Sequence, residues 1–339
     1  MSSSPGSEHG GAVDAAAARY GIPRDAWLDL STGINPNPYP LPAIDPAAWQ
    51  RLPDVSTERA LCRAAAECYG VADPAMVVPT PGSQAAIQWL PRLFSKRRVA
   101  VLSPTYNEHA PAWRNAGHQV IETADPGDAE VVVVVNPNNP DGRVRPPENL
   151  LALGSGRSGR LLVVDEAFAD VVPEASLAGH VGRPGLIILR SVGKVYGLAG
   201  MRLGFVLAAP DVAAAVRRAI GPWAVGGPVA EAGAAALSDA DWLAATRQRL
   251  AAAADRLDAL LTGSGIGVIG GTPLFRLAET AEAGALFDHL AGAAVLVRPF
   301  AAHPTWLRFG LPGDDAGFQR LADVLRLWRE KDWAVREAR

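Results

Sequence analysis

The sequence predicts an α/β fold in which a mostly parallel sheet is followed by a smaller α+β lobe. Four short segments are continuously apolar and rich in branched residues: 99–102, 131–135, 161–164 and 186–189. Strands of this kind are covered on both faces, as in a parallel sheet. Helical patterns separate them, and the 339 residues exceed the usual size of a single hydrophobic core, which predicts two lobes.

The N-terminal region predicts one short helix and one extended segment. The helical pattern of residues 13–20 stops at Gly21 and Pro23. Residues 31–40 contain several prolines and a glycine, so they cannot form regular structure. This segment is either an arm that closes over a cleft or a solvated connector. Residues 57–69 and 85–94 then have helical patterns, the first ended by Gly70.

The C-terminal third alternates between strand and helix patterns. The expected strands are 204–208, 267–269, 274–277, 295–298 and 306–309, and the expected helices are 211–220, 228–261 (as one or two), 283–291 and 314–331. Pro222 and the run 226–228 mark a lobe boundary. We therefore expect an N-terminal arm at 1–45, a large domain at 46–225 and a small domain at 226–339.

The composition excludes several classes of protein. A net charge of −3 gives no electrostatic case for binding nucleic acid or an anionic membrane. Cys62 and Cys68 fit no metal-ligand spacing, so we expect no metal site and two buried thiols in a reducing, cytoplasmic compartment. No apolar stretch approaches the ~18 residues of a membrane span, and residues 1–8 lack a secretory pattern. We expect these eight residues to be flexible.

Polar and aromatic side chains follow the predicted strands where each strand ends. They are Tyr106 and His109, Asn139, Asp165 and Lys194. The carboxyl ends of parallel strands meet at one edge of a sheet, where doubly wound folds bind ligands. The sequence therefore predicts a binding site for a small molecule at this edge.

The residues around Lys194 indicate which small molecule. An amine flanked by Ser191 and Arg202 can bind an aldehyde covalently while its neighbours bind a phosphate, and pyridoxal phosphate has both groups. Asp165 is suited to keep the ring nitrogen protonated. Asn139 can donate to the phenolic oxygen, and Tyr106 can stack on the ring.

Each of these residues also has an ordinary structural interpretation. Lys194 and Arg202 can be loop cations, Asp165 a helix cap or ion-pair partner, and Asn139 part of a turn. His109 either braces Asp165 or is a satisfied core histidine. Ser83 and Gln84 open a helix whose free N–H groups suit a phosphate, although such starts also serve for capping alone.

Five motifs in this order resemble the fold-type I pyridoxal-phosphate family, whose archetype is aspartate aminotransferase: GSQ, PTY, NPNNPDG, VVDEAF and RSVGKVYGLAGMRLGF. The resemblance covers residues 28–310. It implies a mostly parallel seven-stranded sheet, a small α+β C-terminal domain and a homodimer. It implies that Lys194 forms the Schiff base, that Asp165, Asn139 and Tyr106 contact the ring, and that Arg308 binds the substrate's α-carboxylate. The implied phosphate ligands are Ser83, Gln84, Ser191 and Arg202.

Within this family the sequence most resembles the threonine-phosphate decarboxylases of cobalamin biosynthesis. The resemblance rests on His9-Gly10-Gly11, on residues 28–36, on residues 270–276 and on Gly193, where aminotransferases usually have serine. It implies that L-threonine O-3-phosphate is decarboxylated to (R)-1-amino-2-propanol O-2-phosphate. The residues expected to bind this substrate are His9, Asn35, Asn139, Arg298 and Arg308, although His9 and Arg298 can equally be ordinary surface residues.

Two departures from the family pattern have chemical meaning. Phe168 stands where most aminotransferases have a tyrosine that donates to the phenolic oxygen, so one donor is absent. Leu52 stands where relatives often have a tyrosine that reaches a neighbouring subunit's cofactor phosphate. The alternative function is a histidinol-phosphate or related aminotransferase. A regulatory module that binds pyridoxal phosphate is disfavoured, because no basic helix-turn-helix extension accompanies the chain.

Overall fold

The computed structural model describes residues 10–155 and 159–337, so the expected flexibility of residues 1–8 falls outside the described residues. The chain divides into two compact units. The central unit is Pro38–Ala245, and the terminal unit combines the residues up to Asn37 with those from Thr246 onward.

The limits of the two units differ from the expected domain boundaries at 45/46 and 225/226. The residues up to Asn37 belong with the C-terminal part because β1 (Leu28–Asp29) pairs in parallel with β11 (Val295–Leu296). Helix α8 (Gly227–Ser238) packs against α3 (Val55–Tyr69), so it belongs to the central unit. The close approach requires Gly233, because a Cβ there would collide with Leu203 and lie 3.1 Å from Leu61.

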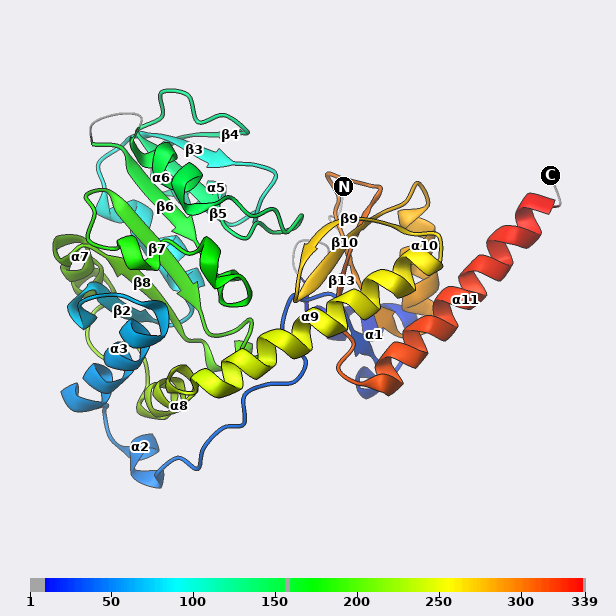
Figure 1. The fold of residues 1–339 in the computed structure, drawn as a ribbon, viewed down its shortest axis with the longest axis horizontal. Helices are drawn as coiled ribbons and strands as arrows, with labels where there is room; N and C mark the ends of the chain where they lie inside the picture. Colours follow the sequence, from blue (N-terminus) through cyan, green and yellow to red (C-terminus); the bar gives the residue numbers. More distant parts are fainter. Residues whose placement is uncertain (1–9, 156–158, 338–339) are drawn as a thin grey trace. The chain divides into compact units, whose positions relative to one another are not determined.

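The central unit is built on a seven-stranded sheet in the order β2-β8-β7-β6-β5-β3-β4 (Figure 1). Only β8 runs antiparallel to its two neighbours, so the expected mostly parallel sheet is confirmed. The strands are β2 Val77–Thr80, β3 Arg98–Leu102, β4 Gln119–Thr123, β5 Val131–Val135, β6 Leu161–Asp165, β7 Leu186–Ser191 and β8 Gly204–Ala208.

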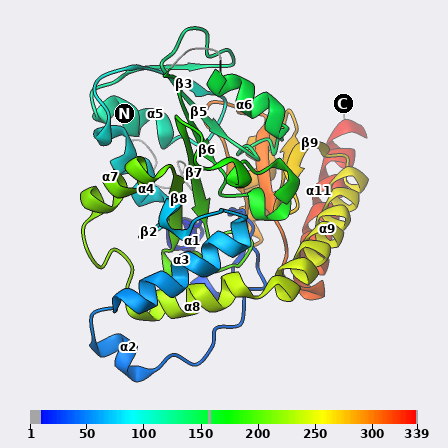
Figure 2. The same cartoon turned by 60° about the vertical axis from the view of Figure 1, so that its left-hand side comes forward.

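Helices cover both faces of this sheet, as the continuously apolar strands predict (Figure 2). One face packs against α4 (Ser83–Trp89), α5 (His109–Asn115) and α7 (Pro210–Ile220), with Val163 and Ile187 in the shared core. The opposite face contacts α3 through the rings of Tyr69 and Phe205, whose centroids are 5.9 Å apart. Helix α6 (Pro147–Ser155) lies against Leu162 on β6, and α2 (Pro46–Gln50) contacts α8.

The terminal unit contains a four-stranded antiparallel sheet in the order β12-β13-β10-β9, besides the β1–β11 pair. Its strands are β9 Gly267–Thr272, β10 Phe275–Glu279, β12 Arg298–Pro299 and β13 Trp306–Gly310. Its helices are α1 Val13–Tyr20, α10 Ala283–Gly292, α11 Asp315–Glu337 and the part of α9 (Ala240–Gly263) beyond Ala245. Among the helices of the described residues, none is both long and apolar enough to cross a membrane.

The proline-rich segment of residues 31–40 belongs partly to each unit. Tyr39 is fixed in the central unit, where its N–H donates to the Tyr196 carbonyl at 2.8 Å and its hydroxyl donates to Asp239 at 3.3 Å. The Tyr39 ring also contacts Trp242 edge-on, with centroids 5.1 Å apart. The part around Tyr39 is therefore packed against the central unit and is not a solvated connector.

Candidate active site

The predicted cofactor residues of the central unit gather at one edge of its sheet. Strands β3, β5, β6 and β7 are parallel, so their carboxyl ends place Tyr106, Asn139, Asp165 and Lys194 at that edge. Strands β2 and β7 are both antiparallel to β8, so the carboxyl end of β2 and the amino end of β8 lie at the same edge. Ser83 and Gln84 follow β2, and Arg202 precedes β8.

Asp165 is held in place by two contacts at the end of β6. One carboxylate oxygen lies 2.8 Å from Nε2 of His109, and the other accepts the Ala167 N–H at 3.0 Å. Asp165 and His109 are both buried, so water does not screen their interaction. The structure thus decides between the two interpretations of His109: it braces the carboxylate.

Lys194 lies on a loop that is held in place by the buried side chains on either side of it. Val192 and Val195 are fully buried, while Lys194 is half-buried. Its Nζ lies 5.4 Å from the centroid of the Phe168 ring, within the range of a cation–π interaction. The Gly193 N–H donates to Ser191 Oγ at 3.3 Å. A Cβ at position 193 would lie 3.0 Å from the Ala199 Cα, so a larger residue there would require Ala199 to shift.

A backbone cradle beside Arg202 fits a phosphate. Gly82, the residue before α4, has φ +76°, and a Cβ on it would lie 2.6 Å from a guanidinium nitrogen of Arg202. Gly204 packs so tightly that a Cβ there would collide with the Ser83 backbone nitrogen. Glycine at both positions allows the start of α4 to approach Arg202 closely. The N–H groups at the start of α4 therefore lie beside the Arg202 guanidinium.

We expect Gly82→Ala to weaken phosphate binding in this cradle. The added methyl group would occupy the position of the Arg202 guanidinium and disfavour the positive φ. Equilibrium dialysis should show a dissociation constant for pyridoxal phosphate raised on the order of 10-fold, about 1.4 kcal/mol. Gly200→Ala is the matched control, since a Cβ there meets nothing within 4 Å. Equal effects of the two substitutions would contradict this interpretation.

The side chain of Gln84 is engaged by protein groups. Its amide donates to Glu108 at 2.9 Å and accepts the Tyr106 hydroxyl hydrogen bond at 3.2 Å. Gln84 thereby orients the ring that is expected to stack on the cofactor. Its backbone N–H, at the start of α4, remains suited to a phosphate. Glu108 was not singled out from the sequence, although it stands between Tyr106 and His109 in the same motif.

The two neighbouring asparagines of the NPNNPDG motif have different surroundings. The Asn138 amide donates to the Pro104 carbonyl at 2.9 Å and to Asp141 at 2.8 Å, and it accepts the Thr105 hydroxyl hydrogen bond at 2.7 Å. Asn138 therefore fixes the loop. Asn139, the predicted ligand of the phenolic oxygen, is buried at the carboxyl end of β5.

In the terminal unit, Arg308 and Arg298 lie directly opposite each other on adjacent strands. Arg308 is 3% exposed, donates to the Ser31 carbonyl at 2.9 Å and lies 5.1 Å from the Phe275 ring centroid. Burial lowers the pKa of Arg308 to about 9, and the positive charge of Arg298 acts in the same direction, whereas Asp29 raises it. Two facing guanidinium groups favour an anionic ligand.

Asn35 and the glycines after His9 lie in the same unit as these arginines. Asn35 is buried and accepts the Asn37 N–H at 2.9 Å. Gly11 donates to the Ser31 hydroxyl at 2.7 Å, and that hydroxyl donates to Asp29. Asp29 and Ser31 lie in the segment 28–36 that carries the resemblance, but only the fold shows that the Ser31 carbonyl accepts a hydrogen bond from Arg308 and that Asp29 raises the pKa of Arg308. His9 itself lies outside the described residues.

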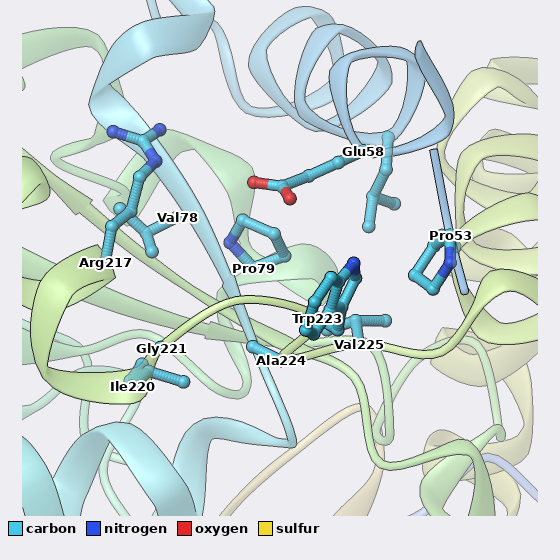
Figure 3. A pocket seen from close by; sticks show the side chains of 12 residues that line it. Pro53, Glu58, Val78, Pro79, Arg217, Ile220, Gly221, Trp223, Ala224 and Val225 are labelled. Carbon is cyan, nitrogen blue, oxygen red and sulfur yellow. The ribbon is translucent and has the colours of Figure 1, made fainter. Parts of the chain in front are cut away.

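A separate hollow in the central unit is too small for a substrate. Figure 3 shows it beside Trp223, with Glu58, Pro79 and Arg217 also in its wall. Its free volume of about 30 Å³ holds little more than a water molecule. None of the predicted site residues lines it, so it is not the active site.

Comparison with known proteins decides the family. Residues 28–325 match the family model described as aminotransferase class I and II. The chain belongs to this family. A threonine-phosphate decarboxylase from Sinorhizobium sp is 47% identical over 328 residues, which cover 94% of this chain and 97% of the relative. A histidinol-phosphate aminotransferase from Cronobacter sakazakii is 31% identical, with 92% of each chain covered.

Solved structures support the fold of this aminotransferase family member. The histidinol-phosphate aminotransferase of Sinorhizobium meliloti, determined in complex with pyridoxal-5'-phosphate, has a TM-score of 0.79 at 21% identity, covering 93% of this chain and 95% of the other. The L-threonine-O-3-phosphate decarboxylase of Porphyromonas gingivalis has a TM-score of 0.75 at 23% identity, covering 89% of this chain and 99% of the other.

The donors at the sheet edge of this family member fit pyridoxal phosphate. The Lys194 amine suits an aldehyde, and the braced Asp165 carboxylate suits a protonated ring nitrogen. The Gly82–Arg202 cradle, which a Cβ would fill, suits the phosphate. Phe168 contributes a buried ring without a hydroxyl, as the sequence indicates, so Asn139 is the remaining predicted donor to the phenolic oxygen.

Proposed function

We propose that this protein uses pyridoxal phosphate to decarboxylate L-threonine O-3-phosphate, giving (R)-1-amino-2-propanol O-2-phosphate for cobalamin biosynthesis. The observation that carries this proposal is the 47% identity with a threonine-phosphate decarboxylase over 94% of this chain and 97% of the relative. The histidinol-phosphate aminotransferase with comparable coverage is only 31% identical. The facing arginines of the terminal unit support a substrate with several negative charges.

The chemistry divides between the cofactor and the residues of this chain. Pyridoxal phosphate, when bound, supplies an electron sink for the bond that breaks at the substrate's Cα. Asp165, oriented by His109, holds the proton on the ring nitrogen. After the bond between Cα and the carboxylate breaks and CO2 leaves, Lys194 or water supplies the proton that forms the new Cα–H bond.

The choice between decarboxylation and transamination is geometric. Which bond at Cα breaks would depend on how the substrate is oriented, so the groups that bind the substrate's anionic ends decide the reaction. We assign the carboxylate to Arg308, whose planar guanidinium can bind it in a bidentate way. Arg298, Asn35, Asn139 and His9 are the proposed partners of the phosphate and of the remaining substrate groups.

The requirement for a second anionic group tests this assignment. We expect kcat/KM for L-threonine O-3-phosphate to exceed that for L-threonine by about 10²-fold or more, because the unphosphorylated substrate supplies a carboxylate to Arg308 but no anion to Arg298 opposite it. Decarboxylation should be followed in parallel assays with each substrate. Equal kcat/KM values for the two substrates would show that the protein does not recognise the substrate phosphate. Turnover of histidinol phosphate with an oxo acid, but not of L-threonine O-3-phosphate, would favour the aminotransferase.

We propose further that the protein is a homodimer formed through the central unit. Large apolar side chains are exposed there: Trp49 is 73% exposed, Val55 67% and Trp223 55%. Pro53 and Trp223 line the same hollow, so the segment 49–55 reaches the hollow beside Trp223 through Pro53 (Figure 3). Leu52, 63% exposed, lies in this segment at the position where relatives often have a tyrosine that reaches a neighbouring subunit. An apolar surface of this kind indicates an interface.

The dimer surface makes a separate prediction. We expect the double variant Trp49→Glu and Val55→Glu to sediment as a monomer, because two carboxylates would be buried in the interface. Ile121→Glu is the control, since Ile121 is 55% exposed on the edge strand β4, away from this segment. If the double variant still sediments as a dimer, this apolar surface is not the dimer interface.

We also propose a cytoplasmic location. Cys62 and Cys68 form no disulfide within the described residues; Cys62 is buried, which raises its pKa to about 11, whereas Cys68 is half-buried, with its Sγ 3.5 Å from the Tyr196 hydroxyl. Cysteines that form no disulfide are typical of proteins in a reducing compartment.

A further inference from the structure

A cluster of buried charges lies behind the candidate active site in the central unit. Arg190 donates through one guanidinium nitrogen to Glu166 at 2.8 Å and through another to Asp170. Glu166 also accepts the Ser176 hydroxyl at 2.5 Å and the Leu177 N–H at 2.7 Å. All three charged side chains are at most 4% exposed. We call Arg190, Glu166 and Asp170 the buried triad.

The triad is attached to the residues that carry the chemistry. Glu166 directly follows Asp165 on β6, and Arg190 directly precedes Ser191 on β7. The Glu166 N–H donates to the Leu189 carbonyl at 2.9 Å, so the triad joins the ends of these two strands. Asp170 lies shortly after Phe168, in the segment that contacts Lys194.

The triad and the site residues occupy opposite faces of the sheet. Ile187 and Leu189 contact the core beneath α4 and α5, so Ser191 points to that face. Arg190 points to the other face, where its guanidinium carbon lies 4.1 Å from the centroid of the Tyr69 ring on α3. The triad therefore does not touch the face on which Asp165 and His109 meet, and it can act there only through the backbone.

Burying three charges is costly, and well-packed apolar side chains often stabilise a core as well or better. A buried guanidinium with two carboxylates is more specific than an apolar contact, because its hydrogen bonds have fixed directions. Burial raises the pKa of Glu166, while Arg190, Ser176 and Leu177 oppose that shift. The geometry of this cluster thus favours one arrangement of the strand ends over others.

We propose that Arg190 is a positioning residue: by binding Glu166 and Asp170 it holds the ends of β6 and β7 so that Asp165 and Ser191 engage the ring nitrogen and the phosphate of one cofactor together. This inference rests on the cofactor assignment and not on the identity of the substrate. Its failure is therefore distinguishable from failure of the proposed decarboxylation.

Arg190→Lys tests the proposal while keeping the positive charge. A lysine ammonium cannot reproduce the fork that spans two carboxylates. We expect the dissociation constant of pyridoxal phosphate to rise on the order of 10-fold. A small displacement of Asp165 and Ser191 weakens the contacts of these residues with the ring nitrogen and the phosphate. The ³¹P resonance of the bound cofactor should shift, because Ser191 moves relative to the phosphate. Glu166→Gln should produce the same changes in the same direction.

Arg160→Lys is the matched control. Arg160 is also buried, it directly precedes β6 at the opposite end of the strand, and it binds the carbonyls of Gly127, Ala129 and Leu153. We expect this substitution to lower Tm as Arg190→Lys does, but to leave the cofactor dissociation constant and the ³¹P shift unchanged. If both variants weaken cofactor binding equally, Arg190 has only a structural role. Unchanged cofactor binding in Arg190→Lys would also overturn the proposal, and if that variant did not fold, Glu166→Gln would decide alone.

Discussion

Lys194→Ala is expected to abolish turnover, with a loss on the order of 10⁴-fold or more in kcat. The amine both attaches the cofactor covalently and is the candidate proton donor to Cα, so its removal eliminates two functions at once. Lys194 is half-buried over Phe168, and its neighbours Val192 and Val195 are fully buried, so the loop should keep its conformation without the amine.

The measurement is mass spectrometry after borohydride reduction, together with steady-state kinetics. The wild-type protein should gain the mass of one cofactor, and the variant should not. Added methylamine should restore part of the activity, because it replaces the missing amine. Lys96→Ala is a control elsewhere in the central unit, and it should keep both the attached cofactor and the activity. Turnover retained in Lys194→Ala would contradict the assignment of the active site.

Arg308→Gln is expected to reduce kcat/KM by about 10²–10³-fold without destabilising the protein. The loss corresponds to ~3–4 kcal/mol, within the range for removing one partner of a buried charged pair. Burial lowers the pKa of Arg308 from its ordinary value to about 9 in the folded protein, so holding its charge near neutral pH opposes folding. Neutral glutamine removes this cost.

Thermal stability, measured by differential scanning fluorimetry, should therefore not fall with the catalytic efficiency, measured by steady-state kinetics. Tm of Arg308→Gln should be unchanged or higher, while KM for L-threonine O-3-phosphate rises. Inorganic phosphate should stabilise the wild-type protein more than the variant, because the anion relieves the repulsion between Arg298 and Arg308. A fall in Tm that accounts for the lost activity would show that Arg308 has a structural role only.

Sequence reasoning was most successful where chemistry follows strand order. Asp165 and Lys194 follow buried apolar strands, and parallel pairing necessarily brings such strand ends to one edge. The role of His109 could not be decided from the sequence, because a buried histidine beside a carboxylate and a core histidine have the same local pattern. The contact to Asp165 at 2.8 Å depends on tertiary packing between α5 and β6.

The remaining features depend on pairings between distant segments. The residues up to Asn37 join the C-terminal part through β1 and β11, two strands of two residues each, which are too short to predict from a pattern. Glu166, Asp170 and Arg190 look like ordinary surface charges in the sequence, yet all three are buried. Gln84 lies at the start of α4, and its role toward the phosphate stays a prediction, but its side-chain partners Tyr106 and Glu108 follow only from the fold.

The central claim is that a carboxylate leaves the substrate, and CO2 release tests it most directly. Protein loaded with pyridoxal phosphate should be mixed with L-threonine O-3-phosphate labelled in its carboxyl carbon, without any oxo acid. We predict labelled CO2 over many turnovers and a product identified as (R)-1-amino-2-propanol O-2-phosphate. No labelled CO2, with the cofactor converted to pyridoxamine phosphate after a single turnover, would contradict the claim and establish an aminotransferase.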